Sequence, residues 1–149
     1  MSETQTTLAP ETTLAIVKPD AVAAGHAGAI LAHLEREGFA LRGVKLLRLS
    51  AEQARAFYAV HAGRPFYASL VEFMTSGPVM PVALERAGAV ARLRQVMGAT
   101  DVAKAEPGTI RALYGTSIER NAIHGSDSPE NAAIELAFFF SRYELIGAR

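Results

Sequence analysis

The order of short apolar segments and helical segments along the chain most constrains what it can fold into. The run T-L-A-I-V-K at 13–18 is apolar, partly β-branched and stops at Pro19, which predicts a buried strand that ends in a loop. Residues 28–37 place apolar side chains on one helical face, and Gly38 follows as a stop signal. The imperfect apolar alternation over 40–49 predicts a second strand.

The middle of the chain is predicted to contain helices and a third strand. Ser50 and Gln53 have the spacing of a capping box, which predicts a helix over 50–61. Apolar patterning then predicts a short helix, a strand and another helix, in that order, over 66–74, 77–84 and 87–97. Pro81 falls inside this strand and removes one ladder hydrogen bond, so we expect the strand to end early or to bulge there.

A long segment without clear periodicity precedes the last strand. Residues 98–121 contain Pro107 and predict a long ordered loop, a kind of segment that is often functional. A brief strand over 122–124 and a last helix beginning at Ser128 complete the order β-α-β-α-α-β-α-loop-β-α. Without the extra short helices this order is βαββαβ, which predicts an α+β, ferredoxin-like fold: a four-stranded antiparallel sheet with helices on one face.

The sequence contains no internal repeat, linker or second core. Its first residues are polar and rich in Thr, so we expect a flexible tail over 1–12 and a single domain over 13–149. The tail lacks the basic start and apolar centre of a secretory signal, and no apolar run approaches the ~18 residues that span a bilayer. We therefore expect a cytoplasmic protein without a membrane partner.

Charge and composition narrow the classes of partner. Lys and Arg number 15, as do Asp and Glu, so the formal net charge is zero. A neutral chain has no long-range attraction for polyanions, and nucleic acid is not expected as its primary partner. An anionic ligand must then be held by a local cluster of cations. The chain has no cysteine, which excludes disulfides, thiolate metal sites and cysteine nucleophiles.

The stretch N-A-I-H-G-S-D at 121–127 carries the most chemical information. His124 lies at a predicted strand end beside a glycine, where little bulk would keep a phosphate from the ring. Neutral imidazole is nucleophilic near neutral pH, and a hydrogen bond to one ring nitrogen fixes the tautomer. Taken alone, the stretch is more simply explained as a turn in which Ser126 and Asp127 compete to cap the last helix.

Three cations elsewhere in the chain favour the chemical interpretation. Lys18 closes the first strand, Arg94 lies on a helix that otherwise faces the core, and Arg111 lies in the long loop. Each of them alone is explained as an ordinary surface charge. Together they supply the positive charge that phosphoryl transfer needs around the transferred oxygens.

Six motifs in the same order resemble nucleoside diphosphate kinases, over about 13–140. They are K-P-D at 18–20, R-P-F at 64–66, T-S-G-P-V at 75–79, M-G-A-T at 97–100, P-G-T-I-R at 107–111 and N-A-I-H-G-S-D at 121–127. The resemblance implies ping-pong transfer of the γ-phosphoryl group of a nucleoside triphosphate, mainly ATP, to nucleoside diphosphates through a phosphohistidine. Such an enzyme maintains the nucleoside and deoxynucleoside triphosphate pools.

The resemblance also implies a role for each matching residue at the nucleotide. His124 would be the nucleophile, and Lys18 and Asn121 would contact the sugar hydroxyls and phosphates. Phe66 would stack on the base, which tolerates different bases because every base has a π-face. Tyr58 would support the lysine and the histidine without contacting the nucleotide itself.

The remaining implied roles concern the phosphates and the histidine ring. Arg94, Thr100 and Arg111 would grip the phosphates. One Mg²⁺ would be the cofactor, held by the nucleotide's own oxygens and by no protein ligand. Glu135 would hold the histidine ring, with Ser126 as its neighbour.

The resemblance further implies a homo-oligomer, either a tetramer or a hexamer, built from dimers that use the second strand and a neighbouring helix. The sequence departs from the family pattern at Asp101 and Val102, where Asn-Pro is common, and at Leu113, where an acidic residue usually precedes an aromatic. Both departures lie in a loop that contributes to subunit contacts in the family. The alternative function is a catalytically inactive family member acting as an interaction module, but every residue that the chemistry requires is present.

Overall fold

The computed structural model describes residues 9–148, which fold around one four-stranded sheet. The strands lie in the order β2-β3-β1-β4, and every neighbouring pair is antiparallel. Their bounds are β1 (Pro10–Val17), β2 (Ala40–Val44), β3 (Met80–Ala87) and β4 (Ile123–Gly125). This arrangement confirms the predicted α+β, ferredoxin-like sheet.

Eight helices and two 3₁₀ turns connect or flank the strands in the described part of the chain. They are α2 (Pro19–Ala23), α3 (Ala27–Arg36), α4 (Ala51–Phe57), η1 (Ala59–His61), α5 (Tyr67–Met74), α6 (Ala89–Met97), η2 (Val102–Lys104), α7 (Ile110–Tyr114), α8 (Pro129–Phe139) and α9 (Arg142–Gly147). Ser50 and Gln53 form the predicted capping box at the start of α4. The described helices include none that is long and apolar enough to cross a membrane.

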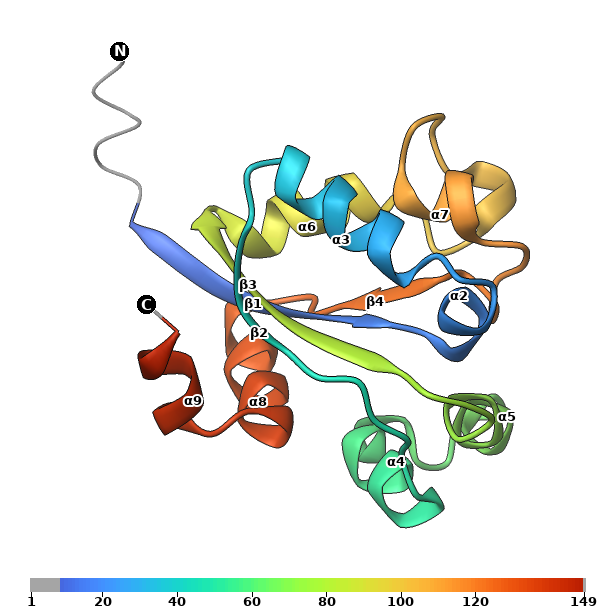
Figure 1. The fold of residues 1–149 in the computed structure, drawn as a ribbon. Coiled ribbons are helices and arrows are strands. Elements are labelled where there is room, and N and C mark those ends of the chain that lie inside the picture. The colour runs from blue at the N-terminus through green and yellow to red at the C-terminus, as the bar shows by residue number, and fades with distance from the viewer. Residues whose placement is uncertain (1–8, 149) are drawn as a thin grey trace.

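Helices cover both faces of the sheet, so the prediction of helices on one face is wrong. Figure 1 shows α3, α6 and α7 on one side and α4, α5 and α8 on the other. Strand β1 is fully buried from Thr13 to Val17 and supplies both cores, since Ala15 and Val17 pack under α3 and α6 while Leu14 and Ile16 pack against α4, α5 and α8. A central strand without a polar face has to be covered twice.

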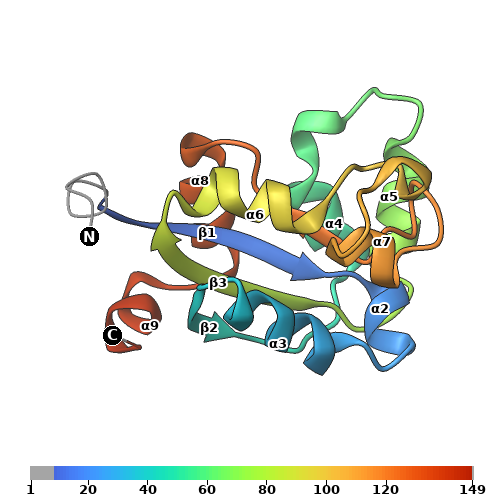
Figure 2. The ribbon, with the colours of Figure 1, turned by 90° about the horizontal axis from the view of Figure 1, so that it is seen from above.

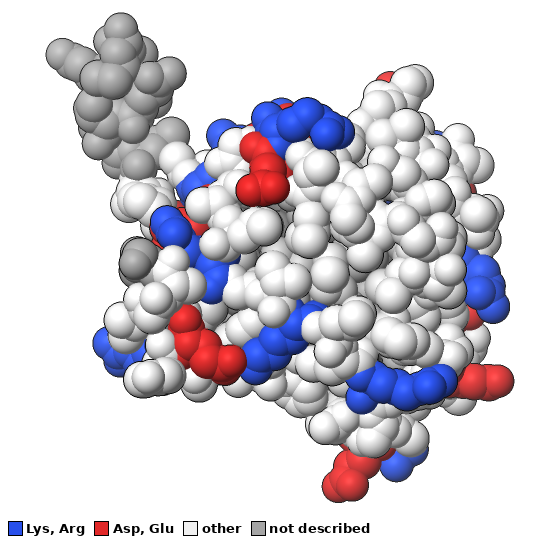
Figure 3. Space-filling view, in the orientation of Figure 1, with Lys and Arg blue, Asp and Glu red and all other residues white. Residues whose placement is uncertain are grey.

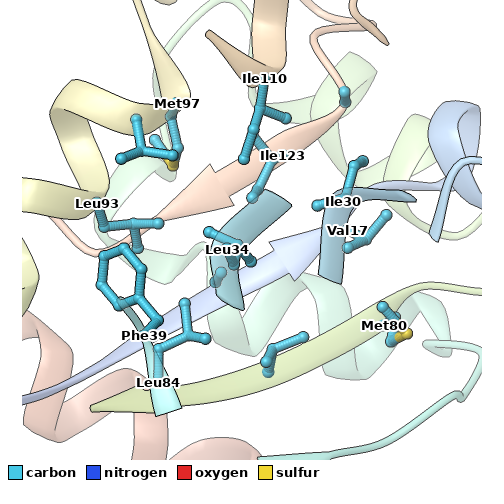
Figure 4. Packing of buried hydrophobic residues seen from close by; sticks show 14 of the residues in the cluster. Val17, Ile30, Leu34, Phe39, Met80, Leu84, Leu93, Met97, Ile110 and Ile123 are labelled. Atoms are coloured by element: carbon cyan, nitrogen blue, oxygen red, sulfur yellow. The ribbon is translucent and has the colours of Figure 1, made fainter. Parts of the chain in front are cut away.

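The core between the sheet and helices α3 and α6 is built from large aliphatic side chains. Leu34 from α3 and Leu93 from α6 meet above Leu84 from β3, with Phe39 beside them (Figure 4). Figure 2 shows α3 and α6 lying over the sheet, with α2 and α7 gathered at the end toward which β1 points. This core therefore packs against β1 and β4, through Val17 and Ile123, at that end of the sheet.

Strand β3 neither ends nor bulges at Pro81, contrary to expectation. Pro81 pairs with Ile16 of β1 inside the strand, and the irregularity in register lies instead between Leu41 and Gly43 of β2. The Pro81 carbonyl accepts a hydrogen bond from the Lys45 N–H, so the missing donor of Pro81 also faces β2. There β2 has already ended at Val44, and the proline is tolerated.

Other boundaries differ from the predicted ones. The tail prediction is wrong for residues 10–12, because Pro10 pairs with Ala87 at the start of β1; residues 1–8 lie outside the described part of the chain. The second strand is shorter than 40–49, and beyond Val44 only an isolated bridge joins Leu47 to Val79. The predicted loop over 98–121 contains η2 and α7, which are too short to show periodicity in the sequence.

Candidate active site

The short strand β4 carries His124, and the following helix, α8, carries Glu135. His124 lies opposite Ile16 of β1 in the ladder. Helix α8 begins soon after the strand because Ser128 caps it with its side chain and Pro129 occupies the first turn. Glu135 lies on the second turn of α8, and its side chain contacts the imidazole.

A carboxylate fixes the tautomer of His124. The Nε2 atom lies 2.8 Å from Oε1 of Glu135, and the same oxygen accepts a hydrogen bond of 2.8 Å from the Ser126 hydroxyl. A carboxylate can only accept, so Nε2 carries the proton and Nδ1 carries the lone pair. Among residues 9–148, Nδ1 has no hydrogen-bond partner, which leaves it available as a nucleophile.

Glu135 stays ionised despite its partial burial. Burial raises the pKa of this carboxyl, but the hydrogen bonds from His124 and Ser126 and the attraction to His124 outweigh it and lower the pKa below its usual range. The charged form therefore prevails at neutral pH and stabilises any positive charge that develops on the ring.

Two aromatic rings hold the imidazole from the side. Tyr58, which the resemblance implies, meets His124 edge-on with ring centroids 6.3 Å apart. Phe57 meets it in the same way at 5.7 Å and was not anticipated, because no motif includes it. Burial raises the pKa of the Tyr58 hydroxyl above its usual value, so this group stays neutral. The structure pairs Tyr58 with the histidine and gives it no hydrogen bond to Lys18 among residues 9–148.

The backbone directly before His124 is strained. Ala122 has a φ of 75°, the one positive value at a described residue other than glycine, and its side chain is fully buried. A hydrogen bond from the Ile123 N–H to the Asn121 carbonyl closes a γ-turn around it. The left-handed conformation costs an alanine about 1–2 kcal/mol, so its neighbours must hold it in place.

Lys18 reaches this turn from the end of β1. Its side chain is 8% exposed, and Nζ donates a hydrogen bond of 2.9 Å to Oδ1 of Asn121. The Asn121 amide in turn donates to the carbonyl of Thr100, at 3.2 Å. The structure therefore links Lys18, Asn121 and Thr100, three of the residues predicted for nucleotide binding.

Two arginines are hydrogen-bonded to the backbone of β4. Arg111 is 5% exposed and donates to the carbonyls of Gly98 and Ile123, at 3.1 and 2.8 Å. Arg94 donates to the carbonyl of Gly125, at 3.3 Å. Both arginines thus bond to the backbone on either side of His124, and each acceptor is a neutral oxygen.

The three cations are close enough to repel one another. Burial, followed by the charge of Arg111, lowers the pKa of Lys18 to about 8, although Asp20 and Glu119 act in the opposite direction. Burial and the charge of Arg94 lower the pKa of Arg111 to about 10. Lys18 and Arg111 are buried, and among residues 9–148 neither they nor Arg94 form an ion pair with a carboxylate, so the cluster is suited to bind a multiply charged anion.

A cavity of about 590 Å³ opens beside this cluster, between α6 and the segment around η2. Arg94 and Thr100 line it, as predicted for phosphate-binding residues, together with Gly98. Lys104 and Thr109 also line it and were not anticipated, since the loop gives no periodic signal. The other residues predicted for the site, His124 among them, do not line this cavity.

Phe66 lies at the start of α5, joined to the histidine through a row of rings. Its side chain is 48% exposed and contacts His61 with centroids 5.3 Å apart. The His61 ring stacks at 6.3 Å on Tyr58, which contacts His124. An exposed aromatic face of this kind can stack on a base.

The chain is similar to proteins of one family. Residues 11–145 match the family model of nucleoside diphosphate kinase. The nucleoside diphosphate kinase of Persephonella marina is 52% identical over 136 residues, 91% of this chain and 97% of that protein. That of Chlamydia abortus is 54% identical over 138 residues, 93% of this chain and 98% of that protein.

Solved structures of the same kind superpose closely. The nucleoside diphosphate kinase of Aquifex aeolicus has a TM-score of 0.89 and 48% identity, covering 92% of this chain and 99% of that one. The halophilic enzyme of Halobacterium salinarum, solved in complex with CDP, has a TM-score of 0.88 and 44% identity, covering 92% of this chain and 91% of that one.

The fold and these relatives define a phosphotransferase that acts on nucleotides. The chain belongs to the nucleoside diphosphate kinase family. It is an enzyme that transfers a phosphoryl group from a nucleoside triphosphate to a nucleoside diphosphate.

Proposed function

We propose that His124 carries the phosphoryl group between the two nucleotides as a phosphohistidine. The observation that supports this most is the hydrogen bond between Nε2 and Glu135, which leaves the lone pair on Nδ1. Nδ1 attacks the γ-phosphorus, the bond to the β,γ-bridging oxygen breaks, and the nucleoside diphosphate leaves. A β-phosphate oxygen of the second diphosphate then attacks the phosphorus, the N–P bond breaks, and the histidine is regenerated.

The cations around β4 stabilise the charge that spreads over the transferred oxygens. Arg94 and Arg111 bind the phosphates from one side, and Thr100 contributes its hydroxyl at the cavity wall. Lys18 and Asn121 approach from the other side and bind the sugar hydroxyls and the phosphates. Their position is fixed before the nucleotide arrives, because each is already hydrogen-bonded to the protein.

Mg²⁺ is proposed as the cofactor and is carried on the nucleotide. No group of three or more His, Cys, Asp or Glu residues that could hold a metal occurs within residues 9–148. Two carboxylates of the site, Asp20 and Glu135, already accept hydrogen bonds from the protein. This donor set fits a metal held by phosphate oxygens and water, and when bound Mg²⁺ supplies neutralisation of phosphate charge.

Phe66 is proposed to stack on the base, and this accommodates different nucleosides. The relative from Halobacterium salinarum was solved with CDP, a nucleoside diphosphate, and the same ligand class is proposed here. Such broad use fits an enzyme that maintains the nucleoside and deoxynucleoside triphosphate pools, with ATP as the main donor. The proposed location is the cytoplasm.

The chain is proposed to form a homo-oligomer, a tetramer or a hexamer built from dimers. Strand β2 is an edge strand of the sheet and pairs with one neighbour only, β3. An exposed edge is a template for a second copy, and a net charge of zero does little to oppose association. Light scattering on the purified chain measures the state directly, and a monomer at micromolar concentration would contradict this proposal.

Labelling with ATP tests the proposed route. Incubation with γ-labelled ATP and Mg²⁺ is expected to leave acid-labile phosphate on the wild-type protein and none on His124→Ala. His61→Ala is the matched control, because this histidine lies nearby but its ring meets Tyr58 and Phe66 instead of Glu135. Normal labelling of His124→Ala would refute the nucleophile, and an intact wild-type fold without any turnover would favour the interaction module.

A further inference from the structure

Asp20 has no role in the proposed mechanism, yet it is bonded to the segment that presents the reacting histidine. It lies in the first turn of α2, and Oδ2 accepts a hydrogen bond of 3.1 Å from the Ala122 N–H. Its other oxygen, Oδ1, is buried and has no hydrogen-bond partner among residues 9–148. A buried carboxylate oxygen without a partner is costly, and such a group is retained where it serves a purpose.

The hydrogen bond from Asp20 falls on the strained residue of the site. Ala122 has the left-handed backbone, and both of its polar backbone groups are held by one segment, since its carbonyl accepts from the Lys18 N–H at 2.8 Å. Two residues later the chain presents His124, and the flanking Ile123 carbonyl accepts from Arg111. A turn that relaxed here would move the imidazole and one of its cations together.

Asp20 also faces Lys18 as a charge. The ionised groups that act on Lys18 are Arg111, which opposes its protonation, and Asp20 and Glu119, which favour it. Of the two acidic groups Asp20 acts more strongly and comes from the same short segment of chain. Its negative charge offsets part of the lowering of the Lys18 pKa that burial causes.

We infer that Asp20 is a positioning residue that holds the γ-turn at Ala122, and thereby His124, in place. This acceptor role and the charge that Asp20 presents to Lys18 are separable effects, because an amide oxygen can still accept from the Ala122 N–H but carries no charge. This inference rests on the proposed phosphohistidine route and adds the element that presents the histidine.

Phosphorylation by phosphoramidate tests the first effect, because this donor has no nucleoside and reports on His124 alone. The rate is expected to fall by about 10- to 100-fold in Asp20→Ala, since small displacements of a reacting group are that costly. Asp20→Asn is expected to restore the rate to within about threefold of the wild type, because the acceptor returns. Ala122→Gly in the Asp20→Ala background is expected to recover part of the loss, since glycine adopts a positive φ without strain.

The pH profile of kcat/KM with nucleotide tests the second effect. In Asp20→Asn the decline at high pH is expected to begin below the wild-type value of about 8, because Lys18 loses an attractive charge. Thermal melts of each variant verify the fold. Phosphoramidate labelling of Asp20→Ala at the wild-type rate would overturn the positioning role. An Asp20→Asn profile that coincides with the wild type would refute an effect of the Asp20 charge on Lys18. Absence of label on His124 in the wild type would instead refute the phosphohistidine route, and the role of Asp20 with it.

Discussion

Cations at the two edges of the sheet are neutralised in different ways. At the β2 edge each cation meets a carboxylate: Arg42 lies 3.0 Å from Glu85, and Lys45 lies 3.1 Å from Glu144. Beside β4, Lys18, Arg94 and Arg111 donate to amide and carbonyl oxygens, and within the described residues none has a carboxylate within the 4.0 Å of an ion pair.

This difference explains how a neutral chain can bind a polyanion. Figure 3 shows basic and acidic side chains intermixed over one face, with broad uncharged areas between them. The net charge of zero is a sum over such pairs and says nothing about a local field. The cations of the β4 edge have been left for a ligand to neutralise, while those of the β2 edge are satisfied within the protein.

The strongest way to break the comparison is to remove a cation from each edge. Arg111→Met is expected to lower kcat/KM by about 10²- to 10³-fold, the cost of losing one donor aimed at developing charge. Arg42→Met is the matched control and is expected to stay within about twofold, because its charge is used by Glu85. Steady-state assays of triphosphate formation measure both variants. Equal losses, or no loss in a folded Arg111→Met, would contradict a functional difference between the edges.

Glu135 is hydrogen-bonded to the His124 ring, and its charge is predicted to matter for the histidine. Glu135→Gln is expected to lower kcat by about 10- to 100-fold, as for other groups that orient an imidazole. Its pKa is lowered in the folded state, so its stabilisation is present above the unfolded value of about 4.3 and is lost as pH falls through the lower folded value. Acid unfolding of Glu135→Gln should lack that component, and an unchanged kcat would remove Glu135 from the account.

The lowered pKa of Lys18 predicts a pH dependence of kcat/KM that the ion-paired cations Arg42 and Lys45 do not cause. Its pKa of about 8 means that the free enzyme loses this charge above pH 8, and kcat/KM is expected to fall about tenfold per pH unit there. Lys18→Arg should move this decline to higher pH, since the guanidinium stays protonated. A wild-type profile that is flat to pH 10 would show that the charge of Lys18 is not needed.

The smallest expected effect concerns stability. The folded pKa of Lys18 lies below its unfolded value of 10.5, so its burial destabilises the fold at neutral pH and the penalty lessens as pH rises from about 8 to 10.5. Lys18→Met is therefore expected to raise the free energy of unfolding at pH 7 by about 1 kcal/mol. Arg42→Met is expected to lower it by less than about 1 kcal/mol. Urea titrations measure the free energy of unfolding of both variants. A lower value for Lys18→Met than for the wild type would contradict the claim that burial of Lys18 destabilises the fold.

Much of the fold could be predicted from the sequence because local signals agreed with the final structure. The run at 13–18 became a fully buried strand, and Ser50 formed its capping box. The same run also indicates that both faces of the sheet are covered, because its side chains are apolar on both faces of the strand. This pattern argues against helices on one side only. Helices such as α7, of a single turn, leave no periodic pattern to find.

The contacts of the site could not be read from periodicity. Helix α8 exposes Ile134, at 69%, and turns the partly buried Glu135 toward His124, the reverse of an ordinary amphipathic helix. Only the resemblance implied a contact between Glu135 and His124. Phe57 and the contact made by Asp20 were missed because they depend on which segments meet in space. Sequence rules fail most often where function overrides local preference.

The position of the phosphate on the imidazole tests the account most directly. Phosphorus–proton correlated NMR of the protein, labelled with ATP and never unfolded, distinguishes a phosphate on Nδ1 from one on Nε2. Because Nε2 is bonded to Glu135, the account predicts phosphate on Nδ1 of His124. Phosphate on Nε2, or on a residue other than His124, would contradict it.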